Sequence, residues 1–212
     1  MENNRRKGKP QMKEIKMNGL TDLISGDEAL QAIEKVGALA DENNIDWAVC
    51  GGIAMAIYGS PRLTKDVDII ASKKLPLKSN EVKAFLKQGG ENFLVETAKR
   101  AVPVDWILRN DEAKQLYQAA LNDAVIINEI AVITPEWLVI LKYIAGRFKD
   151  QEDCIFLLGE TDLVNRAEVK KLILRHGSGE MWLAMRAGLK RWYDLADGTI
   201  NAGKDDYGLR DS

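Results

Sequence analysis

The sequence predicts an α+β (mixed α/β) fold in which a short mixed sheet flanked by helices is followed by a C-terminal helical subdomain. β-Branched runs alternate with helical patterns as far as Ile133, whereas the chain from Thr134 to about Leu195 shows helical patterns only. The length of 212 residues suits one core domain with a helical extension. The predicted parts are a flexible basic tail (1–20), a core (21–134), a helical subdomain (135–197) and a flexible tail (198–212).

The first elements of the core are predicted from caps, glycines and β-branched runs. Ser25 and Glu28 match a capping box, and the helix that follows ends at the polar run 41–44. Residues 45–50 predict a short buried strand, which Gly51-Gly52 turns into a short helix ending near Gly59. Residues 65–71 predict a second strand, and a polar linker then leads to a helix near 81–87.

The later elements follow the same signals. Residues 102–108 predict a strand, and Pro103 indicates a strand start or a sheet edge. A helix is expected around 113–121, followed by two short strands at 124–127 and 130–133. Thr134 caps the next helix with proline at its first position, and the helical part is interrupted by a glycine stop at His176-Gly177.

Composition and charge exclude several classes of protein. The net charge of −2 and the pI of about 5.6 argue against a surface that binds nucleic acid everywhere, although a local basic groove is compatible with them. Cys50 and Cys154 lack metal-ligand spacing and are expected to be reduced and buried. The sequence shows no apolar run long enough to span a membrane and no secretion signal, so we expect a cytoplasmic protein without a membrane partner.

Two aspartates, Asp66 and Asp68, are the most informative residues of the chain. They are one residue apart in a β-branched run, so a strand would direct both carboxylates to the same face while Val67 and Ile69 enter the core. Carboxylates this close repel each other, and a divalent cation such as Mg²⁺ removes the conflict because it prefers hard oxygen ligands. The pair therefore predicts a site for a metal ion and a triphosphate.

Neighbouring residues strengthen this hypothesis. Gly51 and Gly52 lie between a strand and a helix, where backbone N–H groups favour bound phosphate, although the pair can also be only a tight turn. Asp105 interrupts an apolar strand, which is costly unless the charge is paired, bound to metal or at a sheet edge. Cations and hydroxyls that could neutralise triphosphate oxygens lie between the glycines and the aspartates: Ser60, Arg62, Thr64 and Lys65.

A group of charged residues follows in the helical part. Lys142 interrupts an apolar helix, and Lys149 lies seven residues later on the same predicted face. Asp153 lies four residues after Lys149, so a surface ion pair is an alternative explanation for both. Asp150 is placed to anchor Arg147 or Lys149 and to support the site from behind.

These motifs resemble the polymerase-β-type nucleotidyltransferase superfamily. The segment from Val49 to Asp68 is similar to its glycine turn followed by Asp-x-Asp, and Asp105 matches its third aspartate. The run from Thr134 to Asp153 resembles the AbiEii-type family in particular, which includes toxins of abortive-infection toxin–antitoxin systems. Many superfamily members have serine where this chain has Gly52, so backbone N–H groups would have to bind the phosphate instead.

The resemblance implies a fold, an activity and a set of roles. It implies a nucleotidyltransferase-fold core that transfers a nucleoside monophosphate from an NTP to an acceptor hydroxyl, with two Mg²⁺ ions, or Mn²⁺ in their place. Asp66 and Asp68 would hold both ions, Asp105 would complete one ion site and act as the base, and Lys142 would contact the triphosphate.

The sequence leaves the acceptor and the biological role open. An RNA or tRNA end, a small molecule and a protein hydroxyl all remain alternatives for the acceptor. The resemblance implies a cognate antitoxin as a partner, and the sequence gives no oligomeric state. A catalytically inactive protein of the same fold that binds a nucleotide or a partner is the alternative function.

Overall fold

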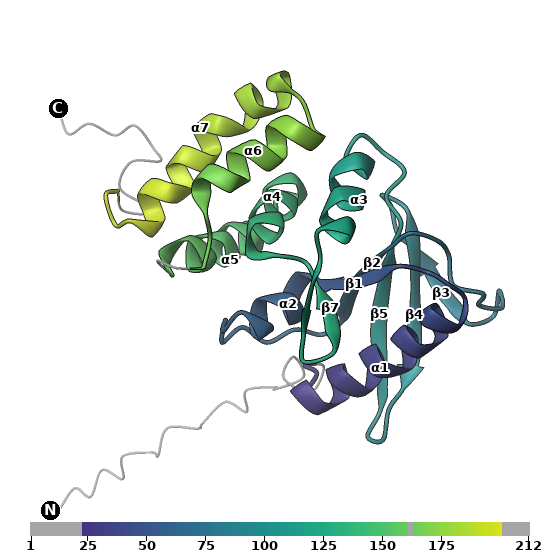
Figure 1. Cartoon of the computed structure of the whole chain (residues 1–212). Helices are drawn as coiled ribbons and strands as arrows, with labels where there is room; N and C mark the ends of the chain where they lie inside the picture. Colours follow the sequence, from purple (N-terminus) through teal and green to yellow (C-terminus); the bar gives the residue numbers. More distant parts are fainter. Residues whose placement is uncertain (1–22, 161–162, 201–212) are drawn as a thin grey trace, which may run out of the picture.

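The computed structural model describes residues 23–160 and 163–200, and the predicted tail at 1–20 lies outside them. Its strands form one seven-stranded mixed sheet in the order β3-β4-β5-β2-β1-β7-β6. This arrangement, with helices around the sheet and a helical C-terminal part, confirms the predicted fold class (Figure 1). The strands are β1 (Trp47–Cys50), β2 (Val67–Ala71), β3 (Val82–Phe85), β4 (Gly90–Glu96), β5 (Ala101–Ile107), β6 (Val125–Ile127) and β7 (Ile130–Val132).

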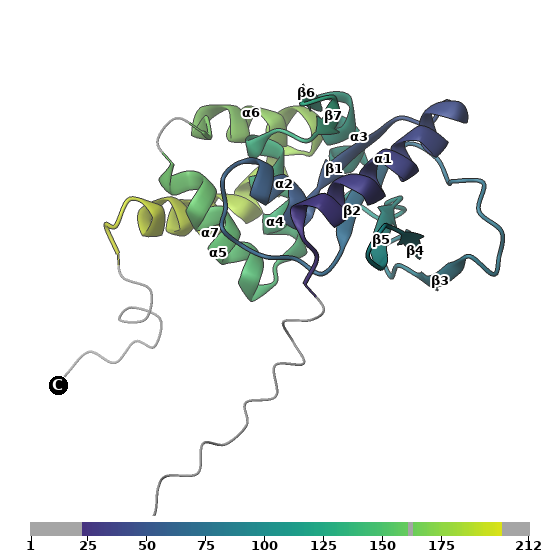
Figure 2. The ribbon, with the colours of Figure 1, turned by 90° about the horizontal axis from the view of Figure 1, so that it is seen from below.

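Helices account for most of the remaining described chain. They are α1 (Gly26–Glu42), α2 (Gly51–Ile57), α3 (Lys114–Asn122), α4 (Pro135–Ala145), α5 (Phe148–Gly159), α6 (Arg166–His176) and α7 (Gly179–Ala196). Figure 2, seen from below, places β3, β4 and β5 at the side of the molecule away from α5 and α7. Among the described residues, no helix combines the length and apolar character needed to cross a membrane.

Helix α1 covers one face of the sheet and contacts β1, β2, β4 and β5. Its start is the predicted capping box, in which the Ser25 hydroxyl accepts from the Glu28 N–H and the Glu28 carboxylate accepts from the Ser25 N–H. Gly37 lets the sheet approach closely, because a Cβ there would lie 2.4 Å from the ring of Trp47. Trp47 and Val49 thus face α1, and the alternate residues of β1 face the opposite side of the sheet.

Two predictions for the middle of the chain are wrong. The helix expected near 81–87 is instead β3, and β4 was not predicted at all. Strand β3 forms the edge of the sheet and buries little, with Phe85 75% exposed, so its residues carry no clear alternation. Gly89 and Gly90 form the turn to β4 with φ angles of +106° and +114°, which bring this turn against the backbone of β5.

Pro103 does not mark a sheet edge, because β5 lies inside the sheet between β4 and β2. The ladder between β5 and β2 begins only at Val104, which pairs with Val67. Pro103 therefore lies just before the residues that pair with β2, where a missing N–H costs little. The expected strands at 124–127 and 130–133 are confirmed as β6 and β7.

The helical part packs directly on the core. Thr134 caps α4 and Pro135 is its first residue, as predicted, while α6 ends at the predicted stop before Gly177. A continuous apolar cluster joins buried residues of the sheet, such as Val49, to those of α4, such as Leu138. Cys50 and Cys154 are both buried and free, as predicted. The division into a core and a subdomain after residue 134 stays a prediction.

Candidate active site

A row of polar side chains crosses four strands on the sheet face opposite α1. The register pairs Cys50 of β1 with Asp68 of β2, Asp68 with Asp105 of β5, and Asp105 with Asn92 of β4. Because paired residues on neighbouring strands direct their side chains to the same face, these four lie side by side. The structure therefore brings together two of the three predicted carboxylates, which are 37 residues apart in sequence.

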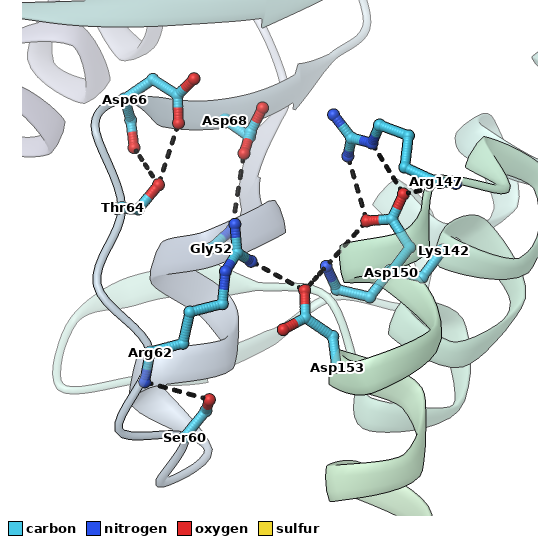
Figure 3. A network of polar contacts seen from close by, with 10 residues as sticks. All are labelled: Gly52, Ser60, Arg62, Thr64, Asp66, Asp68, Lys142, Arg147, Asp150 and Asp153. Carbon is cyan, nitrogen blue, oxygen red and sulfur yellow. Dashed lines mark hydrogen bonds and ion pairs between the residues drawn. The ribbon is translucent and has the colours of Figure 1, made fainter. Parts of the chain in front are cut away.

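Asp66 joins this row from the segment immediately before β2. Its side chain is partly exposed, and its Oδ1 accepts a hydrogen bond of 2.9 Å from the Thr64 hydroxyl. Its charge raises the pKa values of both Asp68 and Asp105. The predicted strand begins two residues later than expected, at Val67, yet Asp66 still belongs to the same carboxylate cluster (Figure 3).

Asp68 is the electrostatic centre of the cluster. Burial, followed by the charges of Asp66 and Asp105, raises the pKa of Asp68 to about 6. The Gly52 N–H, which donates to Asp68 Oδ2 over 3.4 Å, and the charge of Lys142 oppose this shift. Near neutral pH the cluster thus holds carboxylates whose mutual repulsion is only partly relieved by the protein.

The raised pKa of Asp68 predicts a pH-dependent cost to stability. The folded protein binds this proton up to about pH 6 and the unfolded chain only up to about 3.8, so the free energy of unfolding falls as pH rises between these values. We expect Asp68→Asn to be more stable than the wild type at pH 8, by no more than about 3 kcal/mol. Thermal unfolding of both proteins from pH 4 to pH 8 measures the difference, which should shrink toward pH 4. A difference that does not vary with pH would contradict the expectation.

Asp105 lies on an internal strand, so the edge-strand explanation of its charge is wrong. Its Oδ1 accepts a 2.7 Å hydrogen bond from the Asn92 amide. Burial raises the pKa of Asp105, the hydrogen bond from Asn92 opposes the rise, and Asp66 adds to it. Asn92 is a site residue that the sequence analysis missed, because β4 itself was not predicted.

The donor set of the cluster fits a hard divalent cation. Asp66, Asp68 and Asp105 offer carboxylate oxygens whose repulsion raises the pKa values of Asp68 and Asp105, the condition that a bound cation relieves. Among the described residues, however, no three acidic, histidine or cysteine side chains are already positioned as a metal-binding group. The carboxylates would therefore have to change their positions before they shared one ion.

The glycine turn at Gly51-Gly52 leaves room for the Asp68 carboxylate. Gly51 has a φ of +59°, and a Cβ on it would lie 1.9 Å from Asp68 Oδ2. Gly52 is enclosed as well, because a Cβ there would lie 2.7 Å from the Thr64 hydroxyl and 2.8 Å from the Thr64 Cβ. The space beside residue 52 is therefore filled by Thr64, which accounts physically for glycine rather than serine at this position.

We expect Gly52→Ser to destabilise the protein by about 1–3 kcal/mol, the usual cost of forcing atoms into a packed site. Thr64→Gly should remove most of this cost when it is combined with Gly52→Ser, because it removes both the hydroxyl and the Cβ that the serine Cβ would meet. Urea unfolding of the two single variants and the double variant measures the coupling. Additive effects of the two substitutions would show that Thr64 does not determine the fit.

A pocket of about 250 Å³ opens beside Asp68 and Asp105. Three cationic side chains, Lys87, Arg109 and Arg147, contribute to its wall together with Tyr117. Arg147 was predicted near the site, whereas Lys87 and Arg109 were not singled out. A pocket lined by both carboxylates and cations suits a metal–phosphate ligand, because each sign of charge has a partner in it.

Beneath the carboxylates, a buried ionic network joins the core to the helical part (Figure 3). Lys142 is only 5% exposed, and its Nζ lies 2.5 Å from Asp153 Oδ2 and 3.4 Å from Asp150 Oδ1. Arg62, from the segment between α2 and β2, reaches the same Asp153 oxygen at 2.7 Å. Lys142 and Arg62 are therefore held by carboxylates in this structure, and their contact with a triphosphate stays a prediction.

Asp150 anchors Arg147, one of the two partners expected for it. Arg147 donates to Asp150 through Nε over 2.7 Å and through Nη2 over 3.1 Å. The helix expected to carry both Lys142 and Lys149 on one face is broken at Gly146, which has a φ of +65°. Lys149 is exposed at the start of α5, and the Asp153 carboxylate contacts Arg62 and Lys142 in place of Lys149.

The two remaining predicted residues lie on the loop before β2. The Ser60 hydroxyl accepts from the Arg62 N–H over 3.3 Å and so shapes this loop locally. Lys65 is exposed next to Asp66. Neither residue lines the pocket beside Asp68 and Asp105, and their phosphate-binding roles stay predictions.

No protein-family model and no curated protein matches the chain. One similar solved structure is an antigenic nucleotidyltransferase-like protein from Paracoccidioides brasiliensis, with 18% identity, a TM-score of 0.48, and coverage of 82% of this chain and 93% of that chain. Another is the antibiotic-resistance factor ANT(2'')-Ia, with 16% identity, a TM-score of 0.35, and coverage of 79% and 94%. Structural similarity at these low identities and TM-scores assigns no activity to this chain.

Proposed function

We propose that the protein is a nucleotidyltransferase that transfers a nucleoside monophosphate from an NTP to an acceptor hydroxyl. The observation that supports it best is the carboxylate cluster of Asp66, Asp68 and Asp105, of which Asp68 and Asp105 line a pocket together with Arg147 and Arg109. A cluster with a raised pKa at Asp68 suits a ligand that brings its own positive charge. A metal–triphosphate complex combines that charge with phosphate oxygens for the arginines.

In the proposed reaction, the oxygen of the acceptor hydroxyl attacks the α-phosphorus of the NTP. A new P–O bond forms there, and the bond from that phosphorus to the oxygen bridging to the β-phosphate breaks, which releases pyrophosphate. Asp105 takes the hydroxyl proton on Oδ2, because Oδ1 already accepts from Asn92. Burial and the Asp66 charge raise the pKa of Asp105, which makes it a better proton acceptor than an ordinary carboxylate.

Asp66, Asp68 and Asp105 would hold Mg²⁺ in this proposal. When bound, the ions supply positive charge that offsets the carboxylates and the phosphate oxygens, and a pair of ions is the arrangement that the family resemblance implies. Arg147 would bind phosphate oxygens, since Asp150 fixes its guanidinium at the wall of the pocket. Lys142 would act from below by its charge, which lowers the pKa of Asp68.

The test is incubation of the protein with Mg²⁺, α-labelled NTPs and a mixture of total RNA, small molecules and protein, followed by separation of the three fractions. If the label appears in one fraction and the amount of pyrophosphate released equals the amount of label transferred, that fraction contains the acceptor. NTP binding without pyrophosphate release over a long incubation would favour the catalytically inactive alternative. The AbiEii-type resemblance implies a toxin role with a cognate antitoxin. This role is tested separately, by inducing expression of the protein alone and together with a candidate antitoxin and comparing cell growth.

A further inference from the structure

A second cavity, of about 530 Å³, adjoins the pocket that contains Asp68 and Asp105. Its lining residues come from the ends of β2 and β5, from α3 and from the turn that joins β3 to β4. The two hollows share part of their walls: Leu86, Gly89, Ile107, Arg109 and Tyr117. A ligand in the second cavity can therefore extend a reactive group into the pocket that contains Asp105.

The second cavity is cationic. Four basic side chains line it, Lys73, Lys74, Arg109 and Lys114, and none of the described residues lining it is Asp or Glu. Lys74 and Arg109 are engaged elsewhere, with Glu91 at 2.8 Å and with Asp111 at 2.6 Å. Lys73 Nζ donates to the backbone carbonyl of Asn44 over 3.3 Å, and Lys114 is exposed; neither of these lining cations forms an ion pair with a described residue.

The remaining walls suit a flat ring. Phe85 is 75% exposed at the rim, and Tyr117 packs beneath the guanidinium of Arg109 at 4.8 Å. Ile70 and Leu121 add apolar surface. Cations combined with accessible aromatic and apolar surface are the usual recognition elements for a nucleotide, in which a base stacks and a phosphate is neutralised. The volume also lies within the range of small-ligand sites.

We propose that this cavity binds the acceptor, and that the acceptor carries a nucleotide phosphate held by Lys73 and Lys114. The inference rests on the proposed transferase function and specifies its second substrate. The residues that line the cavity all lie between 70 and 121, and none of them belongs to the helices from α4 to α7. A nucleotide at the end of a single strand and a free nucleotide share this chemistry, and the experiment separates them.

The test compares the full chain with Lys73→Glu/Lys114→Glu and with Lys99→Glu/Lys171→Glu as a control of equal charge change. Lys99 and Lys171 are exposed, in the β4–β5 turn and in α6, and line neither hollow. The probe is a fluorescein-labelled RNA pentanucleotide, followed by anisotropy over a range of salt concentrations. We expect the cavity variant to bind at least about tenfold more weakly. The slope of log K against log salt concentration should become shallower by about 0.7, the contribution of one neutralised single-strand phosphate.

Binding of Mg–ATP is measured on the same samples, so that the two proposals fail separately. If the cavity variant and the control bind the pentanucleotide equally, or the wild type does not bind it, the inference is overturned, whatever Mg–ATP does. If neither Mg–ATP nor any of the other three Mg–NTPs, measured in the same way, binds to the wild type, the proposed function fails. Competition by AMP at concentrations near the pentanucleotide Kd supports a free nucleotide as acceptor, whereas failure of AMP to compete supports a strand end.

Discussion

Asp66→Asn combined with Asp68→Asn is expected to abolish nucleotidyl transfer. Both substitutions keep the size of the side chains and remove the charges that a cation would bind, so the fold should persist while the metal–triphosphate complex loses its anchor. We expect the rate to fall by at least about 10³-fold, the upper range for the loss of a preorganised charge contact at a reacting centre. Pyrophosphate release under single-turnover conditions measures the effect.

Metal binding provides a second readout of the same substitutions. Mg²⁺ should raise the Tm of the wild type and should leave the Tm of the double variant unchanged, because only a ligand of the folded state shifts unfolding. The matched control is Asp27→Asn/Asp46→Asn, which makes the same charge change at two exposed positions of the predicted core domain. Transfer that survives in the Asp66/Asp68 variant would overturn the assignment of the site.

Local chemistry explains which features of the fold could be predicted. The capping box at Ser25 and Glu28, the cap at Thr134 and the glycine turn before α2 each depend on residues within a few positions of one another. The caps and the glycine turn were predicted correctly for that reason. The Asp66/Asp68 pair was also found from local spacing, but Asp66 lies just before β2 and the role of the pair stays a prediction.

The missed features depend on contacts between distant segments. Asn92 reaches Asp105 only because β4 pairs with β5, and β4 follows an edge strand that buries almost nothing. Glu91 and Asn92 are both polar and Phe93 and Leu94 both apolar, so the sequence shows no alternation here, and two adjacent glycines obscured the start of the strand. Lys87 lies in the unpredicted turn between β3 and β4, whereas Arg109 follows the predicted strand β5 but was not singled out.

The charged residues after Lys142 show how sequence spacing can mislead. A spacing of four makes Lys149 a natural partner of Asp153, and both residues do lie on the continuous helix α5. Lys149 is exposed, however, whereas Asp153 is buried against Lys142 of α4. Its partner Arg62 is 91 residues away, a distance at which no periodic pattern in one sequence carries information.

Asp153→Asn is expected to lower the free energy of unfolding by about 3–5 kcal/mol, the cost of removing one partner from a buried ion pair. The substitution keeps the shape of the side chain but leaves the buried Lys142 with only the more distant Asp150, which also binds Arg147. Asp197→Asn is the matched control, because it breaks the Arg166 pair whose side chains are 34% and 43% exposed. Such an exposed pair contributes at most about 1 kcal/mol. Urea unfolding measures both variants, and similar losses would contradict the expectation.

A second comparison separates the contribution of the network to the fold from its contribution to the site. Replacing Lys142 with Met and Asp153 with Leu removes both members of the closest buried pair, and such replacements often restore stability. The same double variant releases Arg62 from its partner and removes the Lys142 charge below Asp68. One outcome is that stability returns to that of the wild type while the transfer rate stays at least about tenfold lower, which is a loss of about 1.4 kcal/mol in transition-state stabilisation. In that case the buried ion pairs serve the electrostatics of the carboxylate cluster. If both return together, the network serves only to join α4 and α5 to the loop before β2.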